Sequence, residues 1–135
     1  MCIRDSFGSD EDSLARAAEF IQENTKTDIV DINMGCPVNK IVKNESGAMW
    51  LKDPEKIYKI INKVQSVLDI PLTVKMRTGW SDSSLAVENA LAAEAAGVSA
   101  LAMHGRTREQ MYTCLLYTSF LLLLPSIVAP ATKSK

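Results

Sequence analysis

The chain has 135 residues, of which 47% are apolar and 23% are charged, with 15 Lys and Arg against 16 Asp and Glu. This composition is that of an ordinary folded domain, and it excludes a disordered tail, a collagen-like fibre and a disulfide scaffold. The net charge of −1 also lacks the basic excess that many nucleic-acid-binding domains carry.

The cysteines, the N-terminus and one apolar run bear on the compartment. The three cysteines are far apart and form no CxxC pair, which favours a reducing interior and predicts a cytoplasmic location. The N-terminus has no apolar segment of the kind that a signal peptide needs. The run FLLLL at 120–124 is far shorter than the roughly 20 residues that span a bilayer, so we expect no membrane partner.

Charge is distributed unevenly along the chain. Residues 1–31 hold 3 basic and 8 acidic side chains, whereas residues 36–80 hold 8 basic and 4 acidic ones. Three of the basic residues, Lys56, Lys59 and Lys63, have helical spacing. Two interpretations are open for them, namely the solvated face of a helix and the electrostatic steering of a polyanion.

The hydrophobic pattern alternates between helical spacing and short β-branched runs. Leu14, Ala17, Ala18 and Ile21 mark the buried face of the first helix, which Ser9 or Asp10 can cap. The predicted elements, in chain order, are a helix over 12–24, a strand over 28–33, a helix that begins at Asp53–Pro54, a strand over 72–76, a helix that begins at Ser83 or Ser84 and ends at Gly97, and a strand over 100–104.

This alternation predicts an α/β fold with parallel strands and right-handed crossovers. Both α/β barrels and open α/β sheets place their active sites at the carboxyl ends of the strands. Polar residues gather at these ends in the sequence. They lie in Asn33-Met34-Gly35-Cys36-Pro37, in Lys75-Met76-Arg77 and in His104-Gly105-Arg106-Thr107. We expect these three strand ends to meet at one face.

Cys36 has several possible roles, as a nucleophile, a general acid, a metal ligand or a packed thiol. Its position between Gly and Pro at a strand exit predicts a loop rather than a core location. No further Cys or His lies close by in sequence, so we predict no metal site. A Cys–His hydrolase with His104 as the base lacks an Asn or Asp clearly placed to orient that histidine.

The other candidate site residues could also have purely structural roles. A lysine within an apolar strand, such as Lys75, meets an anion, lines a cavity or extends its ammonium from the strand end. His104, the single histidine, fits a structural role as well, and Asn33 and Arg77 fit turn and surface positions. No GxGxxG or GxxxxGK[ST] motif occurs. Cations at strand ends suit a flavin or a phosphorylated substrate.

Three segments, taken together, resemble the bacterial tRNA-dihydrouridine synthases and most closely their B subtype. They are DINMGCPVNKIVKNESGAMWLKDP, VKMRTGW and HGRTREQMY, and FGSD at 7–10 is similar to the end of an earlier barrel strand in that family. The match runs from about Phe7 to Thr113. It implies a partial (β/α)8 TIM barrel, the central portion with about four of the eight strands, which carries FMN and precedes a small helical domain that grips tRNA.

The reaction that the resemblance implies is the reduction of the uracil C5=C6 bond in tRNA, with NADPH recharging the flavin. Hydride goes to C6, and by resemblance Cys36 supplies the proton for C5 as a general acid. A thiol suits this role because its ordinary pKa of about 8.5 keeps it mostly protonated at neutral pH. Lys75 and His104 match the family's flavin contacts, where a cation stabilises the reduced, anionic flavin.

Four residues match positions that contact the substrate in that family. Asn33 and Arg77 match those that hold the flipped uracil by its polar edge, and Tyr112 matches an aromatic residue that packs near the base. Arg106 matches a contact to flavin phosphate or to the tRNA backbone.

The resemblance stops near both ends of the chain. The family has a flavin-binding Gln where this chain has Asp5, and the chain departs from the family after Thr113. MCIRDS at 1–6 and CLLYTS at 114–119 resemble translated sequencing adapters. We therefore expect 7–113 to be the central part of an FMN-binding barrel domain, flanked by non-native segments at 1–6 and 114–135.

Two other functions stay open at this point. One is another FMN-dependent barrel oxidoreductase that acts on a free pyrimidine, similar to dihydroorotate dehydrogenase, although Arg77 and Tyr112 favour tRNA. The other is an inert partial barrel, because four strands of eight leave open sheet edges and an exposed core.

Overall fold

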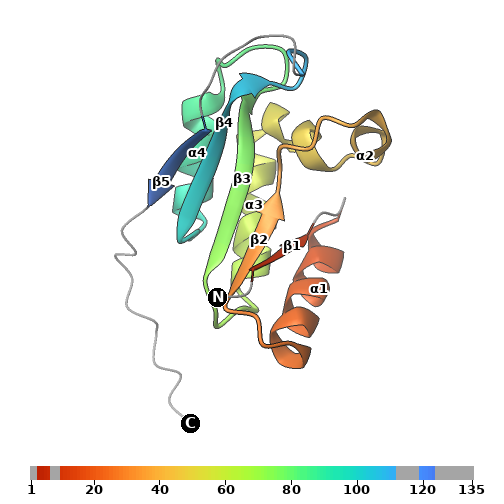
Figure 1. The fold of residues 1–135 in the computed structure, drawn as a ribbon, viewed down its shortest axis with the longest axis vertical. Coiled ribbons are helices and arrows are strands. Elements are labelled where there is room, and N and C mark those ends of the chain that lie inside the picture. The colour runs from red at the N-terminus through yellow and green to blue at the C-terminus, as the bar shows by residue number, and fades with distance from the viewer. Residues whose placement is uncertain (1–2, 7–9, 112–118, 124–135) are drawn as a thin grey trace.

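The computed structural model describes residues 3–6, 10–111 and 119–123 (Figure 1). Helices and strands alternate along most of this length, as the sequence predicts. The elements are β1 (Ile3–Ser6), α1 (Glu11–Asn24), β2 (Ile29–Asn33), α2 (Asn39–Lys43), the 3-10 helix η1 (Gly47–Lys52), α3 (Pro54–Gln65), β3 (Leu72–Gly79), α4 (Ala86–Ala95), β4 (Ala100–Thr107) and β5 (Ser119–Leu123).

The strands form one sheet in the order β1-β2-β3-β4-β5, so neighbours in sequence are neighbours in the sheet. The first four strands are parallel, and β5 pairs antiparallel with β4. Helix α1 packs against α3, and α3 packs against α4, on the same side of the sheet (Figure 1). This is the arrangement of consecutive strands and helices in a (β/α)8 barrel, and it confirms the predicted α/β fold with about four barrel strands.

Local signals in the sequence explain where two of the helices begin. The Asp10 carboxylate accepts hydrogen bonds from the N–H groups of Asp12 and Ser13 at 3.4 and 2.9 Å, which caps α1. Asp53 caps α3 in the same way, and Pro54 occupies the first turn, where it needs no hydrogen-bond partner. Both helix starts agree with the prediction to within one residue.

Helix α4 begins at Ala86 rather than at the predicted Ser83 or Ser84. The Asp82 carboxylate accepts from the Ser84 N–H at 2.9 Å and from the Ser84 hydroxyl at 2.5 Å. These bonds hold the segment in a turn and delay the helix. Its other end is as predicted, since Gly97 has a φ of +98° immediately after the C-cap residue.

The core lies between the sheet and the helices. Strands β2 and β3 alternate in burial, so that Val30 and Val74, for example, face the helices while their sequence neighbours do not. On α1 the buried residues include Ala15, whereas the predicted Ala17 is only half-buried. Helix α3 contributes a stripe of Ile57, Ile60, Ile61 and Val64, and η1 adds Trp50 and Leu51.

The opposite face of the sheet carries polar and small side chains. On β3, Lys75 is exposed although both of its neighbours in sequence are buried. Next to it along the same face, the Thr73 hydroxyl donates to Asp31 at 2.6 Å. In a closed barrel this face points to the interior.

The three lysines at helical spacing lie on the outer surface of α3 and pair with carboxylates. The pairs are Lys56–Glu45 at 3.8 Å, Lys59–Glu55 at 2.8 Å and Lys63–Asp12 at 3.0 Å. This arrangement agrees with a solvated helix face, because carboxylates already compensate the three charges.

Four elements go beyond the predicted ones, namely β1, α2, η1 and β5. Strand β1 falls within 1–6 and β5 within 114–135, the two flanks expected to be non-native, and the origin of these flanks stays a prediction. Within the described ranges, no helix combines the length and the apolar character needed to cross a membrane.

Candidate active site

A cavity of about 230 Å³ lies at the carboxyl ends of β2, β3 and β4. The sheet register explains its composition, because Asn33 on β2 pairs with Lys75 on β3, and Arg77 on β3 pairs with His104 on β4. Paired residues on neighbouring strands point to the same face. The predicted site residues that line this cavity are Asn33, Cys36, Lys75, Arg77 and His104.

Cys36 lies in the loop after β2 and is held from two sides. On one side, Asn33 Oδ1 accepts a hydrogen bond from the Gly35 N–H at 3.0 Å and turns the loop. On the other, the Ala48 N–H donates to the Cys36 carbonyl at 3.1 Å. The cysteine is half-buried and its thiol is free, so the sulfur can reach a molecule in the cavity.

Two glycines allow this close packing around Cys36. A Cβ atom on Gly35 would lie 3.3 Å from the Met76 carbonyl carbon on β3. Gly47 has a φ of +63°, and a Cβ there would lie 3.0 Å from the Cys36 carbonyl oxygen. A side chain at either position would push against the strand or the loop that positions the thiol.

Arg77 is only 4% exposed and ties together two loops of the site. Its Nε donates to the Gly35 carbonyl at 2.9 Å, and its Nη1 donates to the carbonyls of Thr107 and Met111 at 3.2 and 3.3 Å. The loop with Cys36 and the loop after β4 are thus joined through one guanidinium group. Such charge-assisted bonds are stronger than neutral ones.

Positive charge dominates the cavity. Burial lowers the pKa of His104 from its ordinary value of 6.5, and the charges of Arg77, Arg106 and Lys75 lower it further. The imidazole is therefore neutral at neutral pH and surrounded by three cations. An anionic group bound here would gain attraction from all three.

Two predicted site residues lie apart from the cavity lining. Arg106 is half-buried two residues beyond His104 on β4, and it acts on the cavity through its charge. Tyr112 lies outside the described residues. Across the parts of the chain that the structure describes, no three His, Cys, Asp or Glu side chains gather as metal ligands would.

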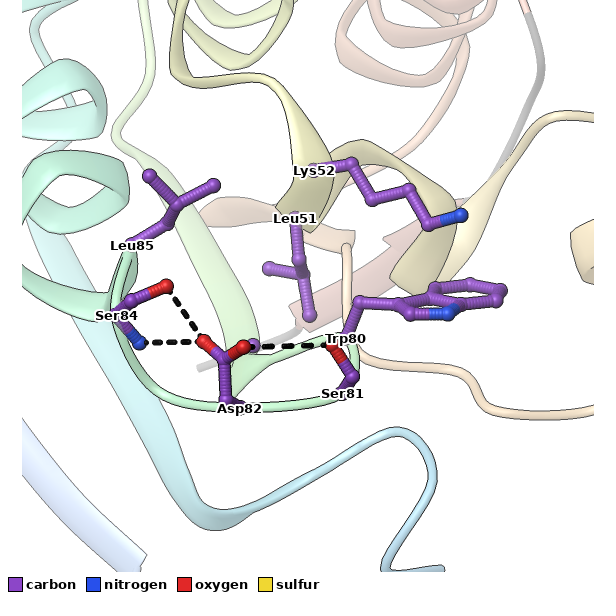
Figure 2. A pocket seen from close by; sticks show the side chains of 8 residues that line it. Leu51, Lys52, Trp80, Ser81, Asp82, Ser84 and Leu85 are labelled. Atoms are coloured by element: carbon purple, nitrogen blue, oxygen red, sulfur yellow. Dashed lines mark hydrogen bonds between the residues drawn. The ribbon is translucent and has the colours of Figure 1, made fainter.

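A second cavity, of about 330 Å³, adjoins residues that the sequence reasoning did not single out (Figure 2). Its lining includes Lys52 from the end of η1 and Trp80 from the turn after β3. The Lys52 ammonium lies 4.0 Å from the centre of the Trp80 ring, and the Arg108 guanidinium carbon lies 4.8 Å from it. The available signal was Trp80 itself, an aromatic residue directly beyond the cations of VKMRTGW.

Comparison with known proteins places this site in a family. The sequence model of the dihydrouridine synthase family, Dus, matches residues 6–118. The chain belongs to this family. The fold is accordingly part of the Dus (β/α)8 barrel, and the resemblance found in the three motif segments is confirmed.

Several individual relatives within the Dus family support the same assignment. The tRNA-dihydrouridine synthase B of Vibrio parahaemolyticus is 45% identical over 106 residues, which are 78% of this chain and 33% of the relative. That of Proteus vulgaris is 43% identical over 106 residues (78% and 32%), and that of Pseudomonas aeruginosa is 43% identical over 102 residues (73% and 31%). The chain thus spans about a third of the length of these relatives.

Proposed function

We propose that the protein containing these residues is a flavin-dependent oxidoreductase that reduces uridine to 5,6-dihydrouridine in tRNA, with FMN as its cofactor, NADPH as the reductant and a cytoplasmic location. The observation that carries this proposal is the meeting of Cys36, Lys75 and His104 in one cavity at the carboxyl edge of a Dus-family sheet. The names of the relatives point to the same substrate.

The described residues fit one part of an FMN site. The cationic surroundings of His104, together with the exposed Lys75 ammonium, suit the N1–C2 carbonyl edge of a flavin, which becomes negatively charged on reduction. A volume of about 230 Å³ is below the range of roughly 300–1,000 Å³ that ligand sites occupy. These residues would therefore form one wall of the site. When bound, reduced FMN would supply the hydride for uracil C6, and NADPH would reduce the flavin again.

Cys36 would complete the reduction by giving the proton of its Sγ to uracil C5. The atoms balance, because C6 gains a hydride and C5 gains a proton, and solvent then reprotonates the thiolate. Proton donation from a positioned side chain requires hydrogen-bond reach of the acceptor atom. The hydrogen bonds that hold the Cys36 loop, one to Asn33 and one from Ala48, support this role.

Asn33 and Arg77 would hold the uracil. Asn33 Oδ1 already accepts from the Gly35 N–H, so its Nδ2 amide is the group that remains to donate to a uracil carbonyl. Arg77 lines the cavity while it anchors both loops. Tyr112, by resemblance, would pack near the base, and Arg106 would contact flavin phosphate or the tRNA backbone.

The role of Cys36 is tested in a full-length chimera, in which residues 7–113 of this chain replace the matching segment of the Vibrio parahaemolyticus relative. In Cys36→Ala we expect flavin reduction by NADPH to continue at a similar rate. Dihydrouridine formation should fall by on the order of 100-fold or more, the usual contribution of a general acid. Cys36→Ser, which keeps the size of the side chain, should be similarly slow because a hydroxyl is a much weaker acid.

Two results of this experiment would contradict parts of the proposal. Unchanged dihydrouridine formation in Cys36→Ala would show that another group donates the proton. Reduction of free uracil or oxidation of dihydroorotate by the unmodified chimera, without action on tRNA, would assign it to the free-pyrimidine oxidoreductases instead.

A further inference from the structure

A cluster of two cations around one indole lies beside the proposed active site. It consists of Lys52, Trp80 and Arg108, and we call it the Trp80 cluster. Both cations are within cation–π range of the ring, at 4.0 and 4.8 Å from its centre. Figure 2 shows the Lys52 side chain extended along the Trp80 ring. The Arg108 guanidinium also donates to the side-chain oxygen of Asn39, at the start of α2.

The cluster is built from the same chain segments as the proposed active site. Trp80 lies three residues beyond Arg77, and Arg108 lies four residues beyond His104. Their backbones are joined, because the Arg108 N–H donates to the Gly79 carbonyl at 2.9 Å. The cluster is therefore fixed at the carboxyl edge of the sheet, next to the cavity with Cys36.

The turn that carries Trp80 is tightly specified. A Cβ atom on Gly79 would lie 1.8 Å from the Asp82 carbonyl oxygen, so only glycine fits at that position. The Glu109 N–H donates to the Trp80 carbonyl at 3.0 Å and joins this turn to the loop after β4. The indole is thus presented by a rigid turn rather than by a free loop.

Among the residues that the structure describes, no carboxylate pairs with either cation of the cluster. Lys56, Lys59 and Lys63 all form ion pairs, but within residues 10–111 neither Lys52 nor Arg108 does. The acids closest in sequence to Lys52 and Trp80 are engaged elsewhere, since Asp53 caps α3 and Asp82 binds Ser84. Two uncompensated cations at a fixed spacing are suited to an anionic partner.

We propose that the Trp80 cluster binds the phosphate backbone of the RNA strand whose base enters the cavity. Lys52 and Arg108 contact the phosphates, and Trp80 is a positioning residue that holds the two cations, since both already occupy its ring. This inference rests on the proposed function, and it adds a contact outside the base-binding cavity. Phosphate contacts of this kind supply affinity and set the register of the strand without reading its sequence.

The experiment measures tRNA binding by the full-length chimera at several salt concentrations. The variants are Lys52→Ala, Arg108→Ala, Trp80→Ala and Trp80→Phe. The matched control is Lys26→Ala. Lys26 is exposed and lies in the connection between α1 and β2, at the amino ends of the strands rather than at their carboxyl ends. We expect Lys52→Ala and Arg108→Ala each to raise the Kd about fivefold and to lower the salt slope by about one. The fold-increase in the Kd for tRNA should exceed any fold-change in the rate of dihydrouridine formation at saturating tRNA.

The tryptophan variants test whether the ring of Trp80 is needed for tRNA binding. Trp80→Ala should raise the Kd about as much as the loss of both cations, whereas Trp80→Phe should retain most of the affinity because a phenyl ring still attracts a cation. If Lys52→Ala and Arg108→Ala bind tRNA as tightly as Lys26→Ala does, while dihydrouridine still forms, the inference is overturned and the proposed function stands. If the variants lose tRNA binding but the unmodified chimera forms no dihydrouridine, the cluster is supported and the proposed function fails.

Discussion

His104 shows how neighbouring charges set the chemistry of a single residue. Its imidazole lies on the open face of β4, near Lys75 on β3, and its pKa is lowered from 6.5 by burial and then by Arg77, Arg106 and Lys75. Below pH 6.5 the unfolded chain binds the proton more readily than the folded one does. Protonation of His104 therefore lowers the free energy of unfolding as the pH falls below 6.5, and it does not lower it at neutral pH.

The lowered pKa of His104 is directly measurable, because this is the only histidine and gives a single imidazole Cε1–H resonance. An NMR pH titration of the chain should give a midpoint below 6.5. Lys75→Met should raise that midpoint, since it removes one of the three cations. Addition of an anion that binds in the cavity should raise it as well. A midpoint at or above 6.5 in the unmodified chain would contradict the cationic environment described for the cavity.

The residues of the cavity were predictable to different degrees. Asn33, Cys36, Lys75 and His104 follow from one rule, because each lies at or just beyond the carboxyl end of a strand predicted from a clear hydrophobic pattern. Strands β3 and β4 continue past these predicted ends, to Gly79 and Thr107. The carbonyl partners of Arg77 could not be predicted, since they depend on the path of two loops. The Trp80 cluster was missed for a similar reason, because Lys52 belongs to a 3-10 helix that has no periodic signal.

At the level of elements, the connection between β2 and α3 is the part that most directly shapes the site. It folds back so that Gly47 and Ala48, at the start of η1, meet the Cys36 carbonyl. The sequence predicted neither α2 nor η1, because both are short and lack a repeated apolar face. Strong caps at Asp10 and Asp53, by contrast, made α1 and α3 predictable.

Gly47→Ala tests whether this connection positions the thiol. We expect it to destabilise the fold by about 1–2 kcal/mol, because alanine is strained at a positive φ. We also expect it to change the alkylation rate of Cys36, since the new Cβ would press on the Cys36 carbonyl and Cβ. The rate is measured in a Cys2→Ser, Cys114→Ser background, so that a single thiol reacts.

Gly97→Ala is the matched control for this prediction. Gly97 also has a positive φ, but its added Cβ would meet only Gln65 Cγ, at 3.6 Å and far from the site in the fold. It should lose similar stability and leave the alkylation rate of Cys36 as it was. Equal alkylation rates in both glycine variants would show that η1 does not position the thiol.

At the scale of the whole molecule, the described residues form an open sheet face rather than a closed barrel interior. The described residues provide a cavity of about 230 Å³ at the cationic strand ends, which is one wall of the proposed flavin site. We therefore expect the 135-residue chain to bind FMN only weakly, with no saturation at micromolar concentrations. A titration that follows the quenching of flavin fluorescence measures this. Tight binding that yields a yellow protein would contradict the view of the chain as an inert partial barrel.

The two flanks differ in how they join the sheet. Strand β1 pairs parallel with β2, in the sense that a barrel requires, whereas β5 pairs antiparallel with β4. All eight strands of a (β/α)8 barrel are parallel. We propose that 114–135 is not barrel sequence. The direction of β5 supports this proposal for the residues from 119 on, whereas the family model matches as far as residue 118. Recovery of a natural gene that encodes CLLYTS at this position would refute it.

The pairing of β5 also has a kinetic consequence. Its register covers Ala100 to His104, which is the edge of β4 that the next strand of a barrel would need. In this chain β5 occupies the edge at which a barrel would add its next parallel strand. A parallel strand from another molecule would therefore have to displace β5 before it could pair with β4. The rate of assembly with complementary barrel fragments would then be limited by the dissociation of β5 from β4, rather than by how well the incoming strand pairs.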